Sequence, residues 1–134
     1  MPKTFYLEII TPDRQFYTGP AESLVMPALD GAYGVEPGHE PIVTALDAGE
    51  LRYKVDGQWQ TAAVAGGFAE VMPEYAILLV SAAEHPEEID GKRAEAARER
   101  AEERLRQKES VQEYYRSKAA LARAMARLKT RGGR

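Results

Sequence analysis

Hydrophobic and polar residues alternate along the first two thirds of the chain with the period of two that is typical of β-strands. In residues 4–10, Phe5, Leu7 and Ile9 alternate with Tyr6 and Glu8. Similar short runs, separated by proline, glycine and aspartate, cover residues 15–17, 22–26, 50–64, 68–72 and 76–81. The run at 50–64 is a hairpin pattern with Asp56-Gly57 as its two-residue turn. Strands at this spacing predict an antiparallel sandwich or flattened barrel.

The pattern becomes helical from Pro86 onward, where Ala, Glu, Arg, Leu and Lys dominate. Ser110-Val111-Gln112-Glu113 matches a capping box, which predicts a second helix start there and a turn near residues 107–109. The sequence therefore predicts an all-β domain over residues 1–86 and an antiparallel helical hairpin over residues 87–134.

Alanine dominates the surfaces that should join the two helices. The expected contact positions are Ala94, Ala97, Ala101 and Leu105 on the first helix, and Val111, Tyr114, Leu121, Met125 and Leu128 on the second, with Ala119, Ala122 and Ala126 beside them. A buried methyl group contributes only about 0.8 kcal/mol. The pattern fits an ordinary alanine-rich hairpin, and it equally fits a hairpin marginal enough to open and rebind elsewhere.

Charge divides the 134 residues at the same place. Residues 1–86 hold four basic and twelve acidic residues, a net charge of −8, whereas residues 87–134 hold fourteen basic and nine acidic residues, a net charge of +5. Such asymmetry suggests two modules, of which the basic one could seek an acidic surface.

Arginines are spaced along one side of the second helix, at Arg116, Arg123, Arg127, Arg131 and Arg134. This basic ridge is either a solvated face or a site for something anionic, such as an acidic protein segment, nucleotide phosphates or nucleic acid. Nucleic acid is the poorest of these fits, because the first module is acidic and no aromatic residue follows Tyr115.

Motifs of common enzymes are missing from the sequence. It has no P-loop and no Gly-x-Ser-x-Gly, and the absence of cysteine excludes a Cys–His pair and thiolate metal sites. His39 and His85 lie in turn-rich stretches. No apolar run approaches the roughly 20 residues of a membrane span, and no export signal is evident, so a bacterial-type cytoplasmic setting is expected. We expect neither a catalytic nor a metal site.

Five motifs in register resemble the epsilon subunit of F-type ATP synthases. Residues 31–41 (GAYGVEPGHEP) and residues 66–71 (GGFAEV) carry most of the resemblance. The segments TPD at 11–13, ID at 89–90 and ALARAMARL at 120–128 follow the family order. The resemblance covers essentially the whole chain.

The resemblance implies a ten-stranded β-sandwich followed by a two-helix hairpin. It also implies a non-catalytic rotor subunit that binds the gamma subunit and rests on the c-ring. Such a subunit is peripheral to the cytoplasmic face of the bacterial cell membrane, couples rotation to proton flow and inhibits ATP hydrolysis. In the extended state its hairpin would reach the alpha and beta catalytic subunits, and the basic ridge (Arg116, Arg123, Arg127, Arg131) would meet acidic segments.

Some bacterial members bind ATP through an Ile/Leu-Asp-x-x-Arg-Ala motif in the folded-down hairpin, and residues 89–94 match it. By this resemblance the ATP-binding residues are Glu84, Ile89, Asp90, Arg93, Ala94, Arg100, Arg123 and Arg127. ATP would then be a regulatory ligand, and no cofactor would be required. Gly91 is a departure that could loosen the site, since glycine near a helix start costs up to about 1 kcal/mol. Alternatively, Asp90 only caps the helix, with Arg93 paired to it.

The resemblance places the rotor interface at Tyr33, Gly34 and His39. Ala32, Tyr33 and Glu36 differ from residues common in the ring-facing loop of the family, which puts the detailed contact with the c-ring in question. The competing class is a free-standing interaction module whose basic hairpin binds an acidic partner or nucleic acid.

Overall fold

The computed structural model describes residues 3–107 and 111–132. In this part of the chain the strands are β1 (Phe5–Ile10), β2 (Gln15–Ala21), β3 (Ser23–Ala28), β4 (Gly31–Val35), β5 (Ile42–Leu46), β6 (Gly49–Val55), β7 (Gln58–Val64), β8 (Gly67–Val71), β9 (Tyr75–Val80) and β10 (Ala83–Glu84). A short 3₁₀ turn, η1 (Pro86–Glu88), precedes the helices α1 (Gly91–Gln107) and α2 (Val111–Arg131). The chain therefore passes from strands to helices where the hydrophobic pattern changes.

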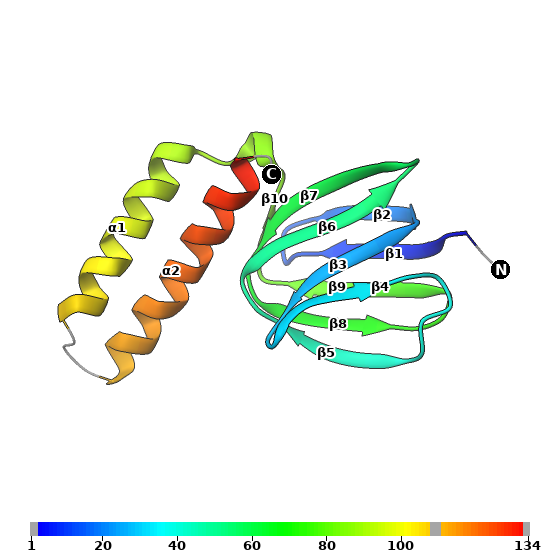
Figure 1. Cartoon of the computed structure of the whole chain (residues 1–134), viewed down its shortest axis with the longest axis horizontal. Coiled ribbons are helices and arrows are strands. Elements are labelled where there is room, and N and C mark those ends of the chain that lie inside the picture. Colours follow the sequence, from blue (N-terminus) through cyan, green and yellow to red (C-terminus); the bar gives the residue numbers. More distant parts are fainter. Residues whose placement is uncertain (1–2, 108–110, 133–134) are drawn as a thin grey trace.

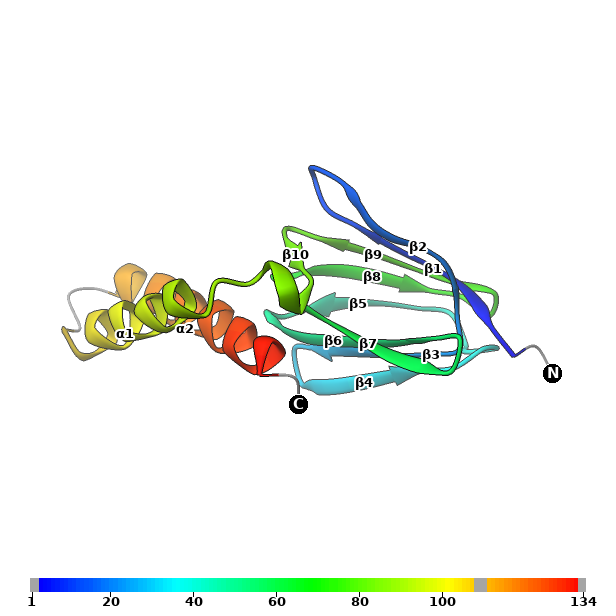
Figure 2. The same ribbon diagram turned by 90° about the horizontal axis from the view of Figure 1, so that it is seen from above.

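The strands form a sandwich that nearly closes on itself (Figures 1 and 2). Their order is β10-β7-β6-β3-β5-β8-β9-β1-β2, with β4 paired to β3. This confirms the predicted sandwich and its number of strands. One pair departs from the antiparallel expectation, because β1 runs parallel to β9. Parallel neighbours need a long connection, and the chain from β2 to β8 provides it.

The hairpin predicted at residues 50–64 has the expected turn, and a second hairpin follows it in the chain. Strands β6 and β7 pair from Gly49 opposite Val64 to Val55 opposite Gln58. Between them, Asp56 and Gly57 have φ angles of 50° and 76°, as a type I′ turn requires. Strands β8 and β9 form the second hairpin.

Some strands extend beyond the predicted runs. Strand β2 continues through Gly19 and Pro20, although this pair is typical of a break between strands. Because β2 lies at the end of the strand order, the missing N–H of Pro20 is tolerated. Strands β4 and β5 were not predicted from periodicity. Glycines in β4 and partly exposed residues in β5 hide the alternation.

Large apolar side chains fill the interior of the sandwich. Those with almost no exposed surface are Leu7, Ile9, Leu24, Met26, Val35, Leu51, Val71 and Leu78. The alternation predicted for residues 4–10 is confirmed, since Phe5, Leu7 and Ile9 are all buried.

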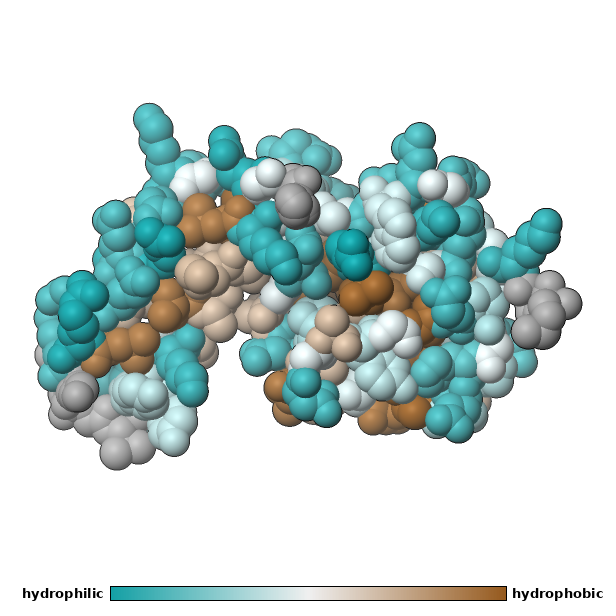
Figure 3. Space-filling model, in the orientation of Figure 1, coloured by the Kyte–Doolittle hydropathy of each residue, from teal (hydrophilic) through white to brown (hydrophobic). Residues whose placement is uncertain are grey.

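Helix α2 lies between α1 and the sandwich and contacts β6 and β7 (Figure 1). In contrast to the sandwich, the buried side chains of the described parts of the helices are small: Ala94, Ala101, Ser117, Ala124, Ala126 and Thr130. Figure 3 shows apolar residues gathered along the line where the helices meet and hydrophilic residues on their outer sides. Tyr114 and Met125, predicted to join the helices, are instead 40% and 49% exposed. Alanines let the backbones approach closely, which leaves these larger side chains outside.

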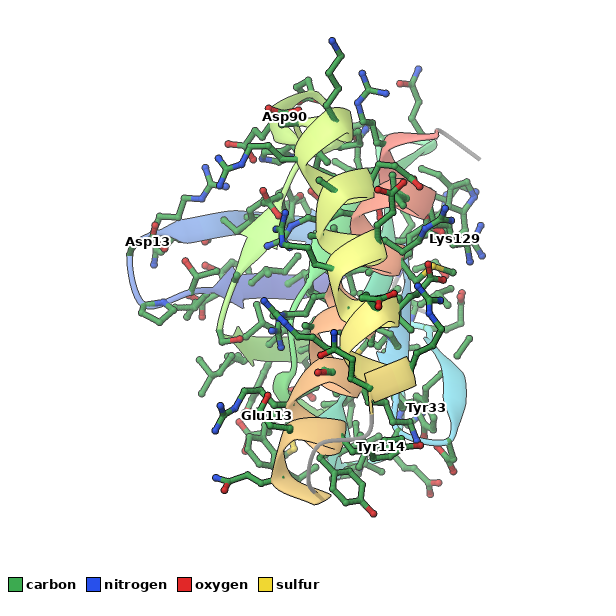
Figure 4. All side chains as sticks on the ribbon, turned by 90° about the vertical axis from the view of Figure 1, so that its left-hand side faces the viewer. Asp13, Tyr33, Asp90, Glu113, Tyr114 and Lys129 are labelled. Carbon is green, nitrogen blue, oxygen red and sulfur yellow. The ribbon has the colours of Figure 1, made fainter. Side chains whose placement is uncertain are left out.

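The helices begin later than the change of composition suggests. Glu87 and Glu88 belong to η1, and Asp90 precedes the first turn of α1. The turn predicted near residues 107–109 and the cap predicted at Ser110 fall largely outside the described residues, as does Arg134. Asp90 and Glu113 mark opposite ends of the hairpin in Figure 4.

Candidate functional site

A cavity of about 330 Å³ lies where the strand-to-helix connection meets both helices. It is lined by Glu84, Glu88, Asp90, Arg93, Ala94, Ala97, Arg100 and Arg127. Six of the eight residues assigned to ATP binding by resemblance are therefore brought together around one space. A seventh, Arg123, lines a smaller neighbouring pocket that shares Glu84 and Arg127. These residues come from β10, the connection, α1 and α2, so only the closed hairpin assembles the site.

Ile89, the eighth residue, packs beneath the site. Its side chain is buried in a small apolar cluster with Ala63 of β7 and Ala94 of α1, against which Leu128 of α2 packs. This cluster joins the sandwich and both helices at one point. The apolar first residue of the Ile-Asp-x-x-Arg-Ala segment thus anchors the start of α1.

Asp90 caps α1. One of its carboxylate oxygens, Oδ1, accepts hydrogen bonds from the backbone N–H groups of Lys92, at 3.0 Å, and Arg93, at 3.2 Å. Capping satisfies donors that a helix start leaves unpaired and favours a negative charge there. The capping role is present in the structure, and Asp90 also lines the cavity.

Gly91 lies against the side chain of Arg131, where the start of α1 meets the end of α2. A Cβ atom at this position would lie 2.8 Å from the guanidinium carbon of Arg131 on α2. The glycine expected to loosen the site therefore leaves room for the Arg131 side chain at the place where the two helices meet.

Two ion pairs hold the walls of the cavity. Arg127 Nε donates to Glu84 Oε1 at 2.5 Å, which joins α2 to the last strand of the sandwich. Arg14, in the β1–β2 turn, donates to both oxygens of Glu88 at 2.9 and 3.1 Å. Glu88 also accepts a 2.7 Å bond from the backbone N–H of His85. These hydrogen bonds lower the pKa of the Glu88 carboxyl from 4.5 to about 2.

The arginines of the basic ridge have different surroundings. Arg116 pairs with Glu113 at 2.7 Å, Arg127 pairs with Glu84, and Arg131 lies against Gly91. Arg123 faces the pocket beside the sandwich. In the closed hairpin, part of the ridge is therefore turned toward the sandwich.

The residues assigned to the rotor interface lie on β4 and in the loop after it. The Tyr33 hydroxyl is 3.1 Å from His39 Nε2, and His39 Nδ1 is 2.6 Å from the carbonyl oxygen of Glu40. Because a carbonyl only accepts, Nδ1 of His39 is the donor to Glu40. Gly34 is exposed, with open space where a Cβ would stand. Figure 1 places the end of β4 away from the helices.

An exposed apolar face on the sandwich was not anticipated from the sequence. Val43, Phe68 and Leu79 on neighbouring strands are 73%, 62% and 54% exposed. Phe68 lies opposite Leu79 in the β8–β9 pairing and opposite Ala45 in the β5–β8 pairing. The sequence carried one signal for this face. Phe68 and Leu79 are large apolar residues at positions that alternate with the buried ones of their strands, where a polar residue is expected.

Comparison with known proteins assigns the family. Residues 4–86 match the family model described as ATP synthase, delta/epsilon chain, beta-sandwich domain. Residues 87–132 match the long alpha-helix domain of the same chain. The chain belongs to the ATP synthase delta/epsilon chain family. The candidate cavity spans the boundary between these two parts of the family, because Glu84 comes from the first and the other lining residues come from the second.

Individual relatives support this assignment over most of the chain. An ATP synthase epsilon chain of Ruminiclostridium cellulolyticum is 53% identical over 125 residues, covering 93% of each chain. One from Caldanaerobacter subterraneus is 52% identical over 130 residues, covering 96% of this chain and 94% of that one.

A solved structure shares the fold. A chain in the Euglena gracilis mitochondrial ATP synthase (OSCP/F1/c-ring, rotational state 1) aligns with a TM-score of 0.84 at 24% identity, covering 96% of this chain and 81% of that one. None of the described helices is long and apolar enough to cross a membrane.

Proposed function

We propose that this member of the delta/epsilon family is a non-catalytic rotor subunit of a proton-translocating F-type ATP synthase, peripheral to the cytoplasmic face of the bacterial cell membrane. Residues 1–86 form its rotor-binding domain and residues 87–134 its mobile regulatory domain. ATP binds in the cavity and holds the hairpin closed. When ATP is scarce the hairpin extends toward the alpha and beta catalytic subunits and inhibits hydrolysis.

The observation that carries the ATP proposal is the convergence of arginines on one cavity. Arg93, Arg100 and Arg127 line it from two helices, and Arg123 stands one turn from Arg127. Guanidinium groups bind phosphate oxygens by strong, paired hydrogen bonds. A ligand that touches both helices and Glu84 binds the closed state better than the open one and therefore stabilises it. If it binds the closed state alone, a ligand concentration of 100 times the dissociation constant stabilises that state by about 2.7 kcal/mol.

The exposed apolar face suits the gamma subunit. Exposed apolar patches mark interaction sites more often than chance, and this one lies on the sandwich, so a partner there leaves the hairpin free to move. We assign Val43, Phe68 and Leu79 to this contact, and the loop with Tyr33, Gly34 and His39 to the c-ring.

Calorimetric titration with ATP tests the nucleotide site. We expect saturable binding to the wild-type protein and at least tenfold weaker binding to the Asp90→Ala, Arg93→Ala double variant. The Glu103→Ala, Arg106→Ala double variant is the matched control, because this exposed pair lies on the same helix away from the cavity. Asp90 also caps α1, so its replacement could weaken the helix itself. A second comparison leaves the cap intact: Arg100→Gln removes an arginine that lines the cavity, and Arg104→Gln, which does not line it, is the control. No binding by the wild-type protein at millimolar ATP would contradict the proposal.

Co-expression with gamma and the catalytic subunits tests the rotor assignment. We expect stable co-purification, and loss of it for a Phe68→Ser, Leu79→Ser variant that stays folded. Salt-sensitive binding to random oligonucleotides without association with gamma would favour the free-standing interaction module instead.

A further inference from the structure

Arg14 lies outside the cavity, in the turn between β1 and β2, yet it contacts the segment that forms one wall. Its guanidinium donates to both carboxylate oxygens of Glu88 and to the carbonyl oxygen of Ala83, the latter at 3.0 Å. In Figure 4, Asp13 marks this turn and Asp90 marks the start of α1. One side chain of the sandwich thus ties down both ends of residues 83–88, which contribute Glu84 and Glu88 to the cavity.

Aromatic rings support the same arrangement. The ring of Phe16 stacks on His85 with centroids 4.0 Å apart and an interplanar angle of 22°, and the Arg14 guanidinium carbon lies 5.1 Å from the centre of the Phe16 ring. The Thr11 side chain fixes the turn by a hydrogen bond with the backbone N–H of Arg14. Arg14 is therefore held in position before any ligand arrives.

The charges that line the cavity show what this contact does. Three carboxylates, those of Glu84, Glu88 and Asp90, would repel an anion. Glu84 is paired with Arg127, and Asp90 is occupied by the N–H groups of α1. Glu88 receives its counter-charge from Arg14, which does not line the cavity. Among the described residues, Arg93 and Arg100 have no acidic partner, so they remain available to a polyanion.

We propose that Arg14 is a positioning residue for the phosphate-bearing ligand: it neutralises Glu88 and holds the 83–88 segment, and so makes the cavity acceptable to an anion. This inference rests on the proposed nucleotide site and adds a residue from the sandwich to it. At neutral pH Glu88 is ionised, so without Arg14 an uncompensated negative charge would face the phosphates.

ATP titrations of four proteins test the inference: the wild type, Arg14→Gln, Glu88→Gln, and the Arg14→Gln, Glu88→Gln double variant. We expect Arg14→Gln to weaken binding about fivefold to tenfold, Glu88→Gln to bind at least as tightly as the wild type, and the double variant to recover to within about twofold of it. Arg52→Gln is the matched control, because it removes the same charge from an exposed sandwich arginine that lies over Trp59. Carboxyl NMR of Glu88 in wild type and Arg14→Gln checks the ion pair without ATP.

The rescue separates a charge effect from damage to the fold. If Arg14→Gln binds ATP as the wild type does, or if the double variant stays as weak as Arg14→Gln, the inference is wrong while the nucleotide site stands. If the wild type fails to bind ATP, the proposed site and this inference are both overturned. If the pKa of Glu88 is the same with and without Arg14, the ion pair does not exist in solution and the inference is also overturned.

Discussion

The sandwich and the helical hairpin are packed by opposite means. Leucine, isoleucine, methionine and valine side chains fill the sandwich, whereas the described buried positions of the helices are alanine, serine and threonine. Each fully buried large side chain contributes about 1.5–3 kcal/mol, whereas an alanine methyl contributes about 0.8 kcal/mol. In addition, the hydroxyls of Ser117 and Thr130 are buried without a hydrogen-bond partner among the described residues.

This difference in packing suits the two regions to the tasks proposed for them. The sandwich has the larger buried side chains, as a platform with fixed surfaces for partners requires. The hairpin is held to it by small apolar contacts and by polar ones, among them Arg127 with Glu84 and Lys129 with Glu50 at 3.8 Å. Contacts of this kind can be exchanged for those of a ligand or a partner at little cost, as the proposed regulatory role of the hairpin requires.

The largest effect should come from the core of the sandwich. Leu51 is fully buried, and Leu51→Ala should lower the free energy of unfolding by about 2–5 kcal/mol through lost burial and a cavity. Urea unfolding followed by Trp59 fluorescence measures this. A loss below about 1 kcal/mol would mean that the sandwich is not the more tightly packed region.

An enlarged side chain between the helices should act locally. Ala101 is fully buried, and Ala101→Leu should destabilise the closed hairpin by about 1–3 kcal/mol through overpacking. Amide spectra of the variant should change in α1 and α2 while the strand resonances keep their positions. Loss of the strand resonances as well would contradict the independence of the two regions.

Two glycines sharpen the same comparison. A Cβ at Gly67 would lie 2.0 Å from the carbonyl oxygen of Leu79, which is backbone, whereas a Cβ at Gly91 would meet only the movable side chain of Arg131. We expect Gly67→Ala to cost about 1–3 kcal/mol and Gly91→Ala to change stability by less than about 1 kcal/mol, since the gain in helix propensity offsets the displaced arginine. Thermal unfolding of both variants measures the two losses of stability. Equal losses for Gly67→Ala and Gly91→Ala would contradict this expectation.

The smallest effect concerns the exposed pair of Arg14 and Glu88. Because the pKa of Glu88 is lowered from 4.5 to about 2, its stabilising contribution is complete above about pH 4.5 and is lost as the pH falls through about 2. The stability difference between the wild type and Glu88→Gln should therefore shrink over this range in acid-unfolding experiments. A difference that stays constant from pH 5 to pH 2 would exclude the ion pair.

Much of the sandwich was predictable because local chemistry determines it. Asp56-Gly57 specifies a hairpin turn, and alternation in residues 4–10 identifies the buried face. The strand through Pro20 was not predictable, since its tolerance depends on an edge position that only the assembled sheet defines. The parallel pairing of β1 with β9 likewise depends on long-range closure.

The candidate site was predictable only in part. The family motif at residues 89–94 led to seven residues that line the two adjoining pockets, together with Ile89 beneath them. Glu88 and Arg14 were missed, because they are 74 positions apart and neither belongs to a motif. The exposed positions of Tyr114 and Met125 were also missed, since periodicity gives the spacing of a helix face but not how closely alanine lets two helices approach.

Hydrogen exchange with and without ATP tests the central claim most directly. We predict that the amides of α1 and α2 exchange much faster than those of β6 and β9 in the free protein. Saturating ATP should slow exchange in both helices and leave the strands unchanged. Helices protected as strongly as the strands and unaffected by ATP would contradict a loosely held, ligand-controlled hairpin on a stable sandwich.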